Sequence, residues 1–305
     1  MPRPLFIGID GGATNCRARI VDGAGRLLGE ATVKASANIA SRGPERVMGV
    51  ILRTVREAAR RAGVAESDWR RAHAGLGLAG GDVKSACNEL LRLFKTQGYF
   101  RKAEIRTDAY FTWLGAFGGE DGAILILGTG SCGLAVVKGV ERYVAGYGPQ
   151  VSDEASSQWL GRMAIRRALW ALDGRIERTA LAQEILFRFR ESPEEIVTFA
   201  NKASASKFGE LAPVVFDYAE RGDAIGVGIV AEAAADGERI IKRLLDLGAS
   251  AVYLHGGISE PLAARLRPGI RKYLKKPMNV EGVPLEGATL LARRLTGDSA
   301  MAGRG

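Results

Sequence analysis

Two turns that combine glycine with threonine or serine could bind phosphate. The first lies in LFIGIDGGATNCRARIVDGAGRLLGEATV, beginning at Leu5, and the second in AILILGTGSCGLAVVKGVERYVAGYG, beginning at Ala123. Backbone N–H groups in such turns can approach phosphate oxygens closely, because glycine has no Cβ in the way. Each stretch predicts a strand, a hydroxyl-bearing glycine turn, a second strand, a short turn and a third strand. We interpret the pair as two phosphate-binding turns in two related domains.

Either turn alone is also typical of an ordinary β-hairpin. The repetition favours the phosphate interpretation, because turn chemistry alone seldom duplicates a whole supersecondary unit at a long period. Neither turn is a Walker A loop, which needs Gly-Lys-Ser or Gly-Lys-Thr at the start of a helix, and neither fits the Rossmann fingerprint.

Two aspartates follow predicted strands and could act on a bound phosphate. Asp10 ends the strand before the first turn. Burying an ionised carboxylate there costs free energy unless a hydrogen bond or a nearby cation stabilises it. Magnesium, held directly or through water, would meet that need. Asp108 follows AEIRT and either caps the next helix or accepts a proton from an attacking hydroxyl. Thr129 and Gly256 also follow predicted strands, and ligands bind beyond the carboxyl ends of such strands, so we expect all four near one cleft.

The elements that position these residues predict an α/β fold. A helix opens at Pro44 and stops at Gly63, and AHAGLGLAG, from Ala72, predicts a buried strand that ends in a glycine turn. Further helices are expected near 82–96, through much of the chain after 153, over 261–274 and over 287–295, with a strand at AVYLH. We place the domain boundary near Gly118. An N-terminal domain (1–118) then carries the first turn, and a C-terminal domain (119–305) carries the second.

Composition excludes several classes of protein. The chain has 305 residues, 47% of them hydrophobic, which suits two globular domains. The net charge of +9 comes from basic residues spread along helices, so we expect no nucleic-acid partner. No apolar run is long enough to cross a membrane, and the start lacks a signal core, which predicts a cytoplasmic protein. Three scattered cysteines form no CxxC pair, so neither a disulfide framework nor a zinc site is expected.

Five motifs, in order, resemble those of the N-acetylglucosamine kinase and bacterial glucosamine kinase group. They are DGGATNCRA at Asp10, TDAY at Thr107, LGTGSCG at Leu127, SDEAS at Ser152 and HGGIS at His255. That group belongs with the BadF/BadG-type ATPases in the sugar kinase, Hsp70 and actin superfamily. The resemblance implies a two-domain, actin-like ATPase (ribonuclease H-like) fold with an interdomain cleft.

The resemblance also implies roles for individual residues. Nucleotide phosphates and magnesium are expected at the first motif, with Asp10 as the magnesium residue, and phosphates again at the second turn. Asp108 matches the base that activates the sugar 6-hydroxyl. The matching nucleotide positions are Asp10, Gly11, Gly12, Ala13, Thr14, Asn15, Gly128, Thr129, Gly130, Ser131 and, in the adenosine motif, Gly256 and Gly257; the sugar-contacting positions are Asn38, Asp108, Gly146 and Asp153.

Two of the sugar positions have other interpretations from their local sequence. Asn38 is also typical of a turn, and Asp153 could cap a helix beginning near Ala155. Ala13 stands where related enzymes often have a third glycine, which narrows the conformations open to that turn.

The sequence therefore predicts a homodimeric, ATP- and Mg²⁺-dependent kinase that phosphorylates O6 of N-acetylglucosamine or glucosamine. One alternative is an ATPase activator of a radical dehydratase, although Cys16, Cys87 and Cys132 do not resemble its cluster-binding set. The other alternative is a non-catalytic sugar sensor. Such regulators usually carry a DNA-binding helix-turn-helix, for which we expect no room before the first strand.

Overall fold

The computed structural model describes residues 4–296, which form two compact units. The first unit combines the described residues up to Glu120 with those from Glu281 on, and the second unit is Asp121–Val280. The chain thus returns to its first unit at its last helix. We expected 119–305 to form one domain, and the segment from Glu281 on corrects that expectation.

The first unit is built on a five-stranded sheet with the order β3-β2-β1-β4-β5. Strand β1 is antiparallel to β2 and parallel to β4, which is in turn parallel to β5. The elements are β1 (Phe6–Gly11), β2 (Cys16–Val21), β3 (Leu27–Val33), α1 (Ile39–Arg42), α2 (Pro44–Ala62), α3 (Glu66–Trp69), β4 (His73–Leu78), α4 (Lys84–Thr96), β5 (Lys102–Thr107), α5 (Asp108–Phe117) and α14 (Val283–Arg294).

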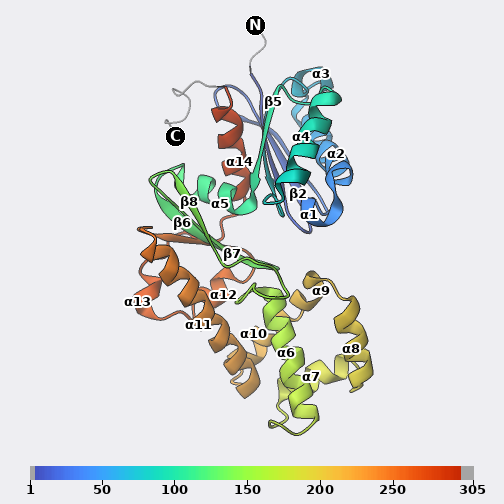
Figure 1. Cartoon of the computed structure of the whole chain (residues 1–305), viewed down its shortest axis with the longest axis vertical. Coiled ribbons are helices and arrows are strands. Elements are labelled where there is room, and N and C mark those ends of the chain that lie inside the picture. Colours follow the sequence, from blue (N-terminus) through green and yellow to red (C-terminus); the bar gives the residue numbers. More distant parts are fainter. Residues whose placement is uncertain (1–3, 297–305) are drawn as a thin grey trace. The chain divides into compact units, whose positions relative to one another are not determined.

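Helix α14 belongs to the first unit because two glycines make room for it. An added Cβ at Gly8 of β1 or at Gly75 of β4 would meet the backbone of α14, and α14 also packs along α5 (Figure 1). Ile7 and Ile9 point to the opposite face of β1, where they join the hydrophobic core that includes residues of α2. The sheet is therefore covered on both faces.

The second unit has a four-stranded sheet with the order β8-β7-β6-β9. Helix α11 packs against this sheet, and a mainly helical segment lies between β8 and α11 (Figure 1). The elements are β6 (Gly122–Leu127), β7 (Ser131–Val137), β8 (Val140–Val144), α6 (Ser157–Leu172), α7 (Ala180–Arg188), α8 (Pro193–Lys202), α9 (Ala205–Gly209), α10 (Ala212–Glu220), α11 (Ala224–Asp246), β9 (Val252–His255), α12 (Ser259–Ala263) and α13 (Pro268–Arg271).

The two sheets repeat one topology. In each, the first strand forms an antiparallel meander with the next two strands and pairs in parallel with a later strand. The order β3-β2-β1-β4 thus corresponds to β8-β7-β6-β9. The duplicated three-stranded unit expected from the sequence is confirmed, and each glycine turn joins the first two strands of its meander.

Two helix predictions near the end of the chain need correction. The helix expected over 261–274 is divided into α12 and α13, because Arg267 is held in an extended conformation before Pro268. The last helix begins at Val283 rather than at 287, after Gly282 in a left-handed conformation. By contrast, α2 begins at Pro44 and is capped by Gly63, as predicted.

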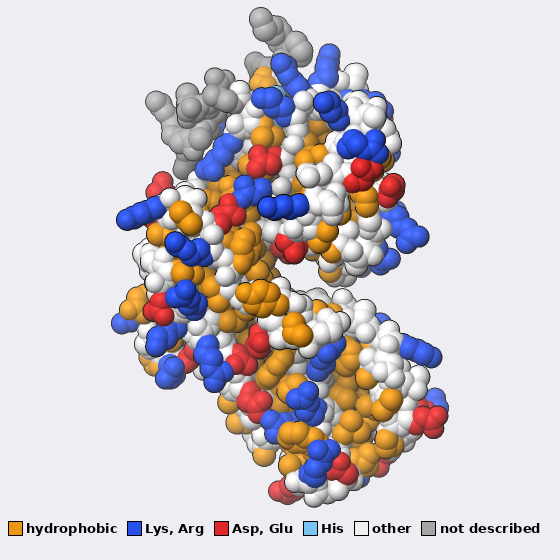
Figure 2. All heavy atoms as spheres, viewed as in Figure 1, with side chains coloured by type: hydrophobic (Ala, Val, Ile, Leu, Met, Phe, Trp, Pro, Cys, Tyr) orange, Lys and Arg blue, Asp and Glu red, His pale blue; other side chains and the backbone are white. Residues whose placement is uncertain are grey.

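Basic side chains are dispersed on the surface. Figure 2 shows Lys and Arg scattered among Asp and Glu on the face in view. Many of these basic side chains form ion pairs with acidic side chains of the same helix. Arg60 and Arg61, for example, both pair with Glu57. None of the described helices combines the length and apolar character that crossing a bilayer requires.

Candidate active site

The carboxyl ends of three parallel strands align in the first unit. Gly11, at the end of β1, pairs with Leu78 of β4, which pairs with Thr107 of β5. The first glycine turn and Asp108 therefore leave the sheet at the same edge. The structure brings together Asp10 and Asp108, as the positions of their strands predicted.

Asp10 is a partly buried carboxylate next to the first turn. Burial raises the pKa of Asp10 to about 6, and the positive charge of Arg17 only partly opposes this. Arg17 lies opposite Asp10 on β2. An ionised Asp10 is therefore poorly stabilised by the protein alone, which suits a site that a bound cation completes.

Asp108 is the first residue of α5, and its carboxylate is not the helix cap. Thr107 is the N-cap, since its Oγ1 accepts a hydrogen bond from the Tyr110 N–H at 3.1 Å. The Asp108 carboxylate accepts one from the Ala109 N–H at 2.8 Å. Burial raises the pKa of Asp108 to about 6, the Ala109 N–H lowers it, and the charges of Asp10 and Asp82 raise it further. Asp108 thus has the properties of a general base.

The first glycine turn presents free N–H groups. The Gly12 N–H donates to the Asn15 carbonyl at 2.9 Å, which closes the turn. Ala13 and Thr14, at its tip, are exposed, and their backbone N–H groups donate to none of the described residues. Such groups are available to phosphate oxygens.

Asn38 is tied to this turn. The N–H of Ala37 donates to the carbonyl of Gly12 at 3.0 Å, so the segment before Asn38 runs beside the turn. The Asn38 Oδ1 caps α1 by accepting the Ser41 N–H at 3.1 Å. The turn-forming interpretation of Asn38 is therefore correct, and it fixes the amide so that its oxygen is engaged while its NH₂ group contacts no acceptor in the described residues.

The second glycine turn is held against the start of α6. The Gly128 N–H donates to the Gly130 carbonyl at 3.0 Å, while the carbonyls of Gly128 and Thr129 accept the N–H groups of Ser157 and Gln158. The Ser131 Oγ donates to the carbonyl of Glu154 at 2.7 Å. The turn and the SDEAS segment thus form one hydrogen-bonded assembly.

Asp153 lies against this turn and is only 7% exposed. A Cβ added at Gly130 would be 2.8 Å from its Oδ2, so a side chain at this position would displace the carboxylate. Burial raises the pKa of Asp153, and the backbone N–H groups of Ser131 and Gly148 oppose the rise. Ser156 is the N-cap of α6, so Asp153 does not cap that helix, contrary to the alternative interpretation of its position.

The remaining predicted residues of the second unit surround the same turn. A Cβ at Gly146 would be 3.0 Å from the Cys132 Sγ, and a Cβ at Gly256 would be 2.9 Å from the Gly128 nitrogen. Gly257 is exposed, with open space around it. No local pattern in the sequence indicated Asn279, whose Oδ1 accepts the Gly256 N–H at 2.9 Å and holds the HGGIS turn.

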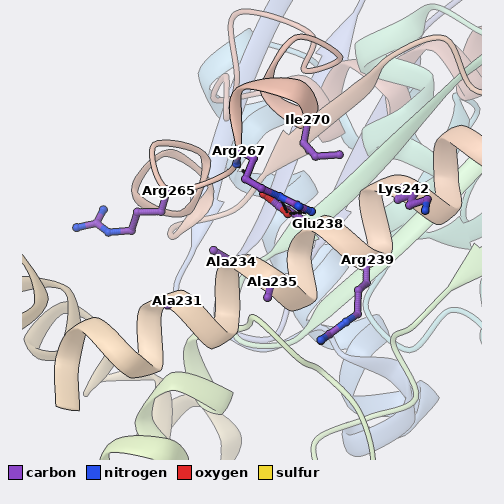
Figure 3. A pocket seen from close by; sticks show the side chains of 9 residues that line it. All are labelled: Ala231, Ala234, Ala235, Glu238, Arg239, Lys242, Arg265, Arg267 and Ile270. Atoms are coloured by element: carbon purple, nitrogen blue, oxygen red, sulfur yellow. Dashed lines mark hydrogen bonds and ion pairs between the residues drawn. The ribbon is translucent and has the colours of Figure 1, made fainter. Parts of the chain in front are cut away.

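A cavity of about 560 Å³ beside α11 contains none of the predicted residues. Figure 3 shows Arg267 turned toward Glu238, with Arg239 and Arg265 extending away from the cavity. Arg239 pairs with Asp236, and Arg265 pairs with Glu220. These cations are therefore already compensated, and the cavity has no group suited to the predicted chemistry.

Two related sheets, each with a glycine turn after its first strand and acidic side chains beside that turn, define an actin-like ATPase architecture. The model of the BadF/BadG/BcrA/BcrD ATPase family matches residues 7–292, and the chain belongs to this family.

Relatives with assigned activities cover most of the chain. Glucosamine kinase GspK of Vibrio cholerae is 34% identical over 288 residues, which are 94% of this chain and 95% of that protein. N-acetyl-D-glucosamine kinase of Dictyostelium discoideum is 30% identical over 252 residues, 77% of each chain. A crystal structure of a candidate N-acetylglucosamine kinase from Chromobacterium violaceum is similar with a TM-score of 0.83, at 32% identity over 95% of this chain and 99% of that one. The fold expected from the sequence is confirmed.

Proposed function

We propose that this protein is an ATP-dependent kinase that transfers the γ-phosphoryl group of ATP to the 6-hydroxyl of glucosamine or N-acetylglucosamine. The names of the relatives support the substrate class. The observation that carries the mechanism is the carboxylate of Asp108, desolvated at the sheet edge where the first glycine turn begins.

Asp108 is assigned as the base. Its carboxylate accepts the proton of the sugar O6 as that oxygen forms its bond to the γ-phosphorus, and the bond from the γ-phosphorus to the bridging oxygen of ADP breaks. The proton later leaves Asp108 to solvent. A pKa near 6 suits this role, because the carboxylate is mostly ionised at neutral pH and still basic enough to take a proton.

The two glycine turns are assigned to the phosphates. Their N–H groups, at Ala13 and Thr14 in the first turn and at Thr129 and Gly130 in the second, donate to none of the described residues. In the proposal they donate to phosphate oxygens and stabilise the charge that develops during transfer. The proposal requires both turns to act on one ATP. Gly256 and Gly257 are assigned to the nucleoside.

Magnesium is assigned to Asp10, held directly or through water. The described residues contain no cluster of three or more metal-ligating side chains, and Mg²⁺ in nucleotide sites commonly needs only one or two carboxylates besides water and phosphate. The desolvated Asp10 carboxylate fits such a site. When bound, the ion would neutralise charge on the phosphates.

The amino sugar is assigned to Asn38, Gly146 and Asp153, together with Asp108 as the base. The Asn38 NH₂ group can donate to a sugar hydroxyl, while its oxygen already accepts the Ser41 N–H at the cap of α1. Asp153 can accept a sugar hydroxyl, since a carboxylate has acceptor sites beyond those that its two backbone neighbours use. Donor and acceptor together would orient the ring.

The radical dehydratase activator is disfavoured by its need for accessible cysteines. Cys16 and Cys87 are buried in the core of the first unit, and Cys132 is partly buried in the second. Thiols in a packed core cannot ligate a metal cluster shared with another subunit unless the core is disrupted.

A homodimer in the cytoplasm completes the proposal. The dimer rests on the family resemblance, and sedimentation at micromolar concentration tests it. The cytoplasm is the compartment that supplies ATP to such an enzyme, and fractionation of the source cells tests that location.

A substrate panel tests the function. ADP release is measured with ATP and Mg²⁺ and, separately, glucosamine, N-acetylglucosamine, N-acetylmannosamine and glucose. We expect one of the first two sugars to stimulate release most strongly. Release that no sugar stimulates would contradict the kinase proposal and favour an ATPase activator.

A further inference from the structure

The loop after β4, residues 79–81, lies among the groups assigned to catalysis in the first unit. It leaves the sheet between the ends of β1 and β5, since Leu78 pairs with both Gly11 and Thr107. The sequence indicated only a glycine turn here, and the proposed function gives this loop no role.

Hydrogen bonds connect the loop to the first phosphate turn and to the sugar segment. The Ala79 N–H donates to the Gly11 carbonyl at 2.9 Å, and the Ala79 carbonyl accepts the Ile39 N–H at 3.0 Å. The residues on either side of Asn38 are therefore both fixed, Ala37 to Gly12 and Ile39 to Ala79.

Gly80 closes this connection in a conformation that suits glycine alone. Its φ is +73°, and an added Cβ would be 2.7 Å from the Ala40 Cβ, 2.9 Å from the Ala40 nitrogen and 3.0 Å from the Asn38 Oδ1. A side chain here would push on Asn38 and on the helix that Asn38 caps.

Gly81 faces the other side of the loop. An added Cβ would be 2.8 Å from the carbonyl oxygens of both Leu78 and Arg106, the latter on the strand that leads directly to Asp108. A side chain at Gly80 and a side chain at Gly81 would thus meet different parts of the site.

We propose that residues 79–81 form a positioning loop for phosphoryl transfer, in which Gly80 sets the sugar-binding Asn38 and Gly81 sets the strand end that holds Asp108. This inference rests on the proposed function. It assigns two separable effects to two neighbouring residues, because Asn38 acts in sugar binding and Asp108 acts in the chemical step.

Steady-state kinetics of two variants test the proposal. We expect Gly80→Ala to raise KM for the amino sugar about tenfold with kcat little changed, because a small displacement of a binding group is costly. Gly81→Ala should lower kcat about tenfold with a smaller effect on the sugar KM. Gly63→Ala is the matched control, since Gly63 also has a positive φ, of 64°, but open space around it. It should lower thermal stability and leave both constants unchanged.

Hydrogen exchange of the wild-type protein provides a measurement that does not depend on the folding of a variant. Adding the amino sugar should slow exchange of the Ile39 and Ala79 amides together, since a hydrogen bond joins these residues. Slower exchange of the Ile39 amide alone would contradict the loop's role. Identical changes in KM and kcat in all three variants would contradict it as well. Absence of sugar-stimulated ADP release by the wild-type protein would instead contradict the proposed function. Failure of the loop proposal and failure of the proposed function are therefore distinguishable.

Discussion

At the scale of single residues, the site combines carboxylates that are poorly stabilised by the protein around them. Asp10 and Asp108 have raised pKa values, chiefly because of burial, and each lies at the end of a parallel strand. Such groups cost stability, and proteins tolerate them where they serve a function.

Asp108→Asn should lower kcat by about 10² or more with nucleotide affinity little changed, because it removes the proton acceptor while preserving size. The measurement is turnover at saturating sugar, with ATP-analogue affinity from calorimetry. Near-normal turnover would show that Asp108 is not the base.

The same variant should be more stable than the wild type at alkaline pH. The folded chain binds the Asp108 proton more tightly than the unfolded chain, since the pKa rises from 3.8 to about 6 on folding. Ionised Asp108 therefore destabilises the fold progressively as pH rises from about 4 to 6, and fully above that range. At about pH 8 the thermal unfolding temperature of Asp108→Asn should therefore be higher than that of the wild type. Near pH 4 this difference should disappear. A variant less stable than the wild type at both pH values would contradict the burial argument.

The pH profile of kcat/KM should report the same carboxylate. Activity should fall as pH drops below about 6, because protonated Asp108 cannot accept the O6 proton. Asp82→Asn removes a charge that raises the pKa of Asp108, so it should move this acid limb to lower pH. Asp68→Asn, at an exposed helical position, is the control and should leave the limb in place. A shift to higher pH in Asp82→Asn would refute the electrostatic account.

At the scale of elements, each phosphate turn is joined to a segment assigned to the sugar. In the first unit the link is the bond from Ala37 to Gly12, and in the second it is the contact of Gly130 with Asp153. Misplacing either turn should therefore disturb both substrates.

Gly130→Ala should lower kcat/KM for both ATP and sugar by about tenfold or more, because its Cβ would displace the Asp153 carboxylate. Gly228→Ala, in open space on α11, is the matched control and should have no effect on either constant. An effect of Gly130→Ala on ATP alone would mean that Asp153 does not depend on the turn.

Many of the helices, strands and turns could be predicted from the sequence. The repeated meander, α2 with its proline start and glycine cap, and the strand before Asp108 all follow from local patterns. The roles of Asn279 and Gly80 could not be predicted, because they depend on contacts between segments distant in the sequence. The cap of α5 could not be predicted locally, since Thr107 and Asp108 are both good capping residues and only the structure distinguishes them.

At the scale of the whole molecule, the chain completes its first unit last. Helix α14 covers β1 and β4 and packs on α5, so the strand that carries Asp10 and the helix that begins at Asp108 both depend on residues near the C-terminus. This return could not be predicted from the sequence, since an amphipathic helix does not specify which sheet it covers.

A chain ended after Val280 should fail to form the first unit. Without α14, the face of the sheet around Gly8 and Gly75 has no packing partner. Hydrogen exchange should show β1 and β4 unprotected in the shortened chain and protected in the full chain, with β6 and β7 protected in both. Protection of β1 and β4 in the shortened chain would contradict this dependence.

The central claim is that Asp108 directs a phosphoryl group from ATP to the 6-hydroxyl of an amino sugar, and the product itself tests it most directly. The wild-type protein is incubated with ATP, Mg²⁺ and glucosamine or N-acetylglucosamine, and the product is analysed by phosphorus–proton NMR. The account predicts a product whose phosphorus signal is coupled to the protons on C6. The Asp108→Asn variant should form this product far more slowly. ADP formation without any sugar phosphate, or a phosphate on another oxygen, would contradict it.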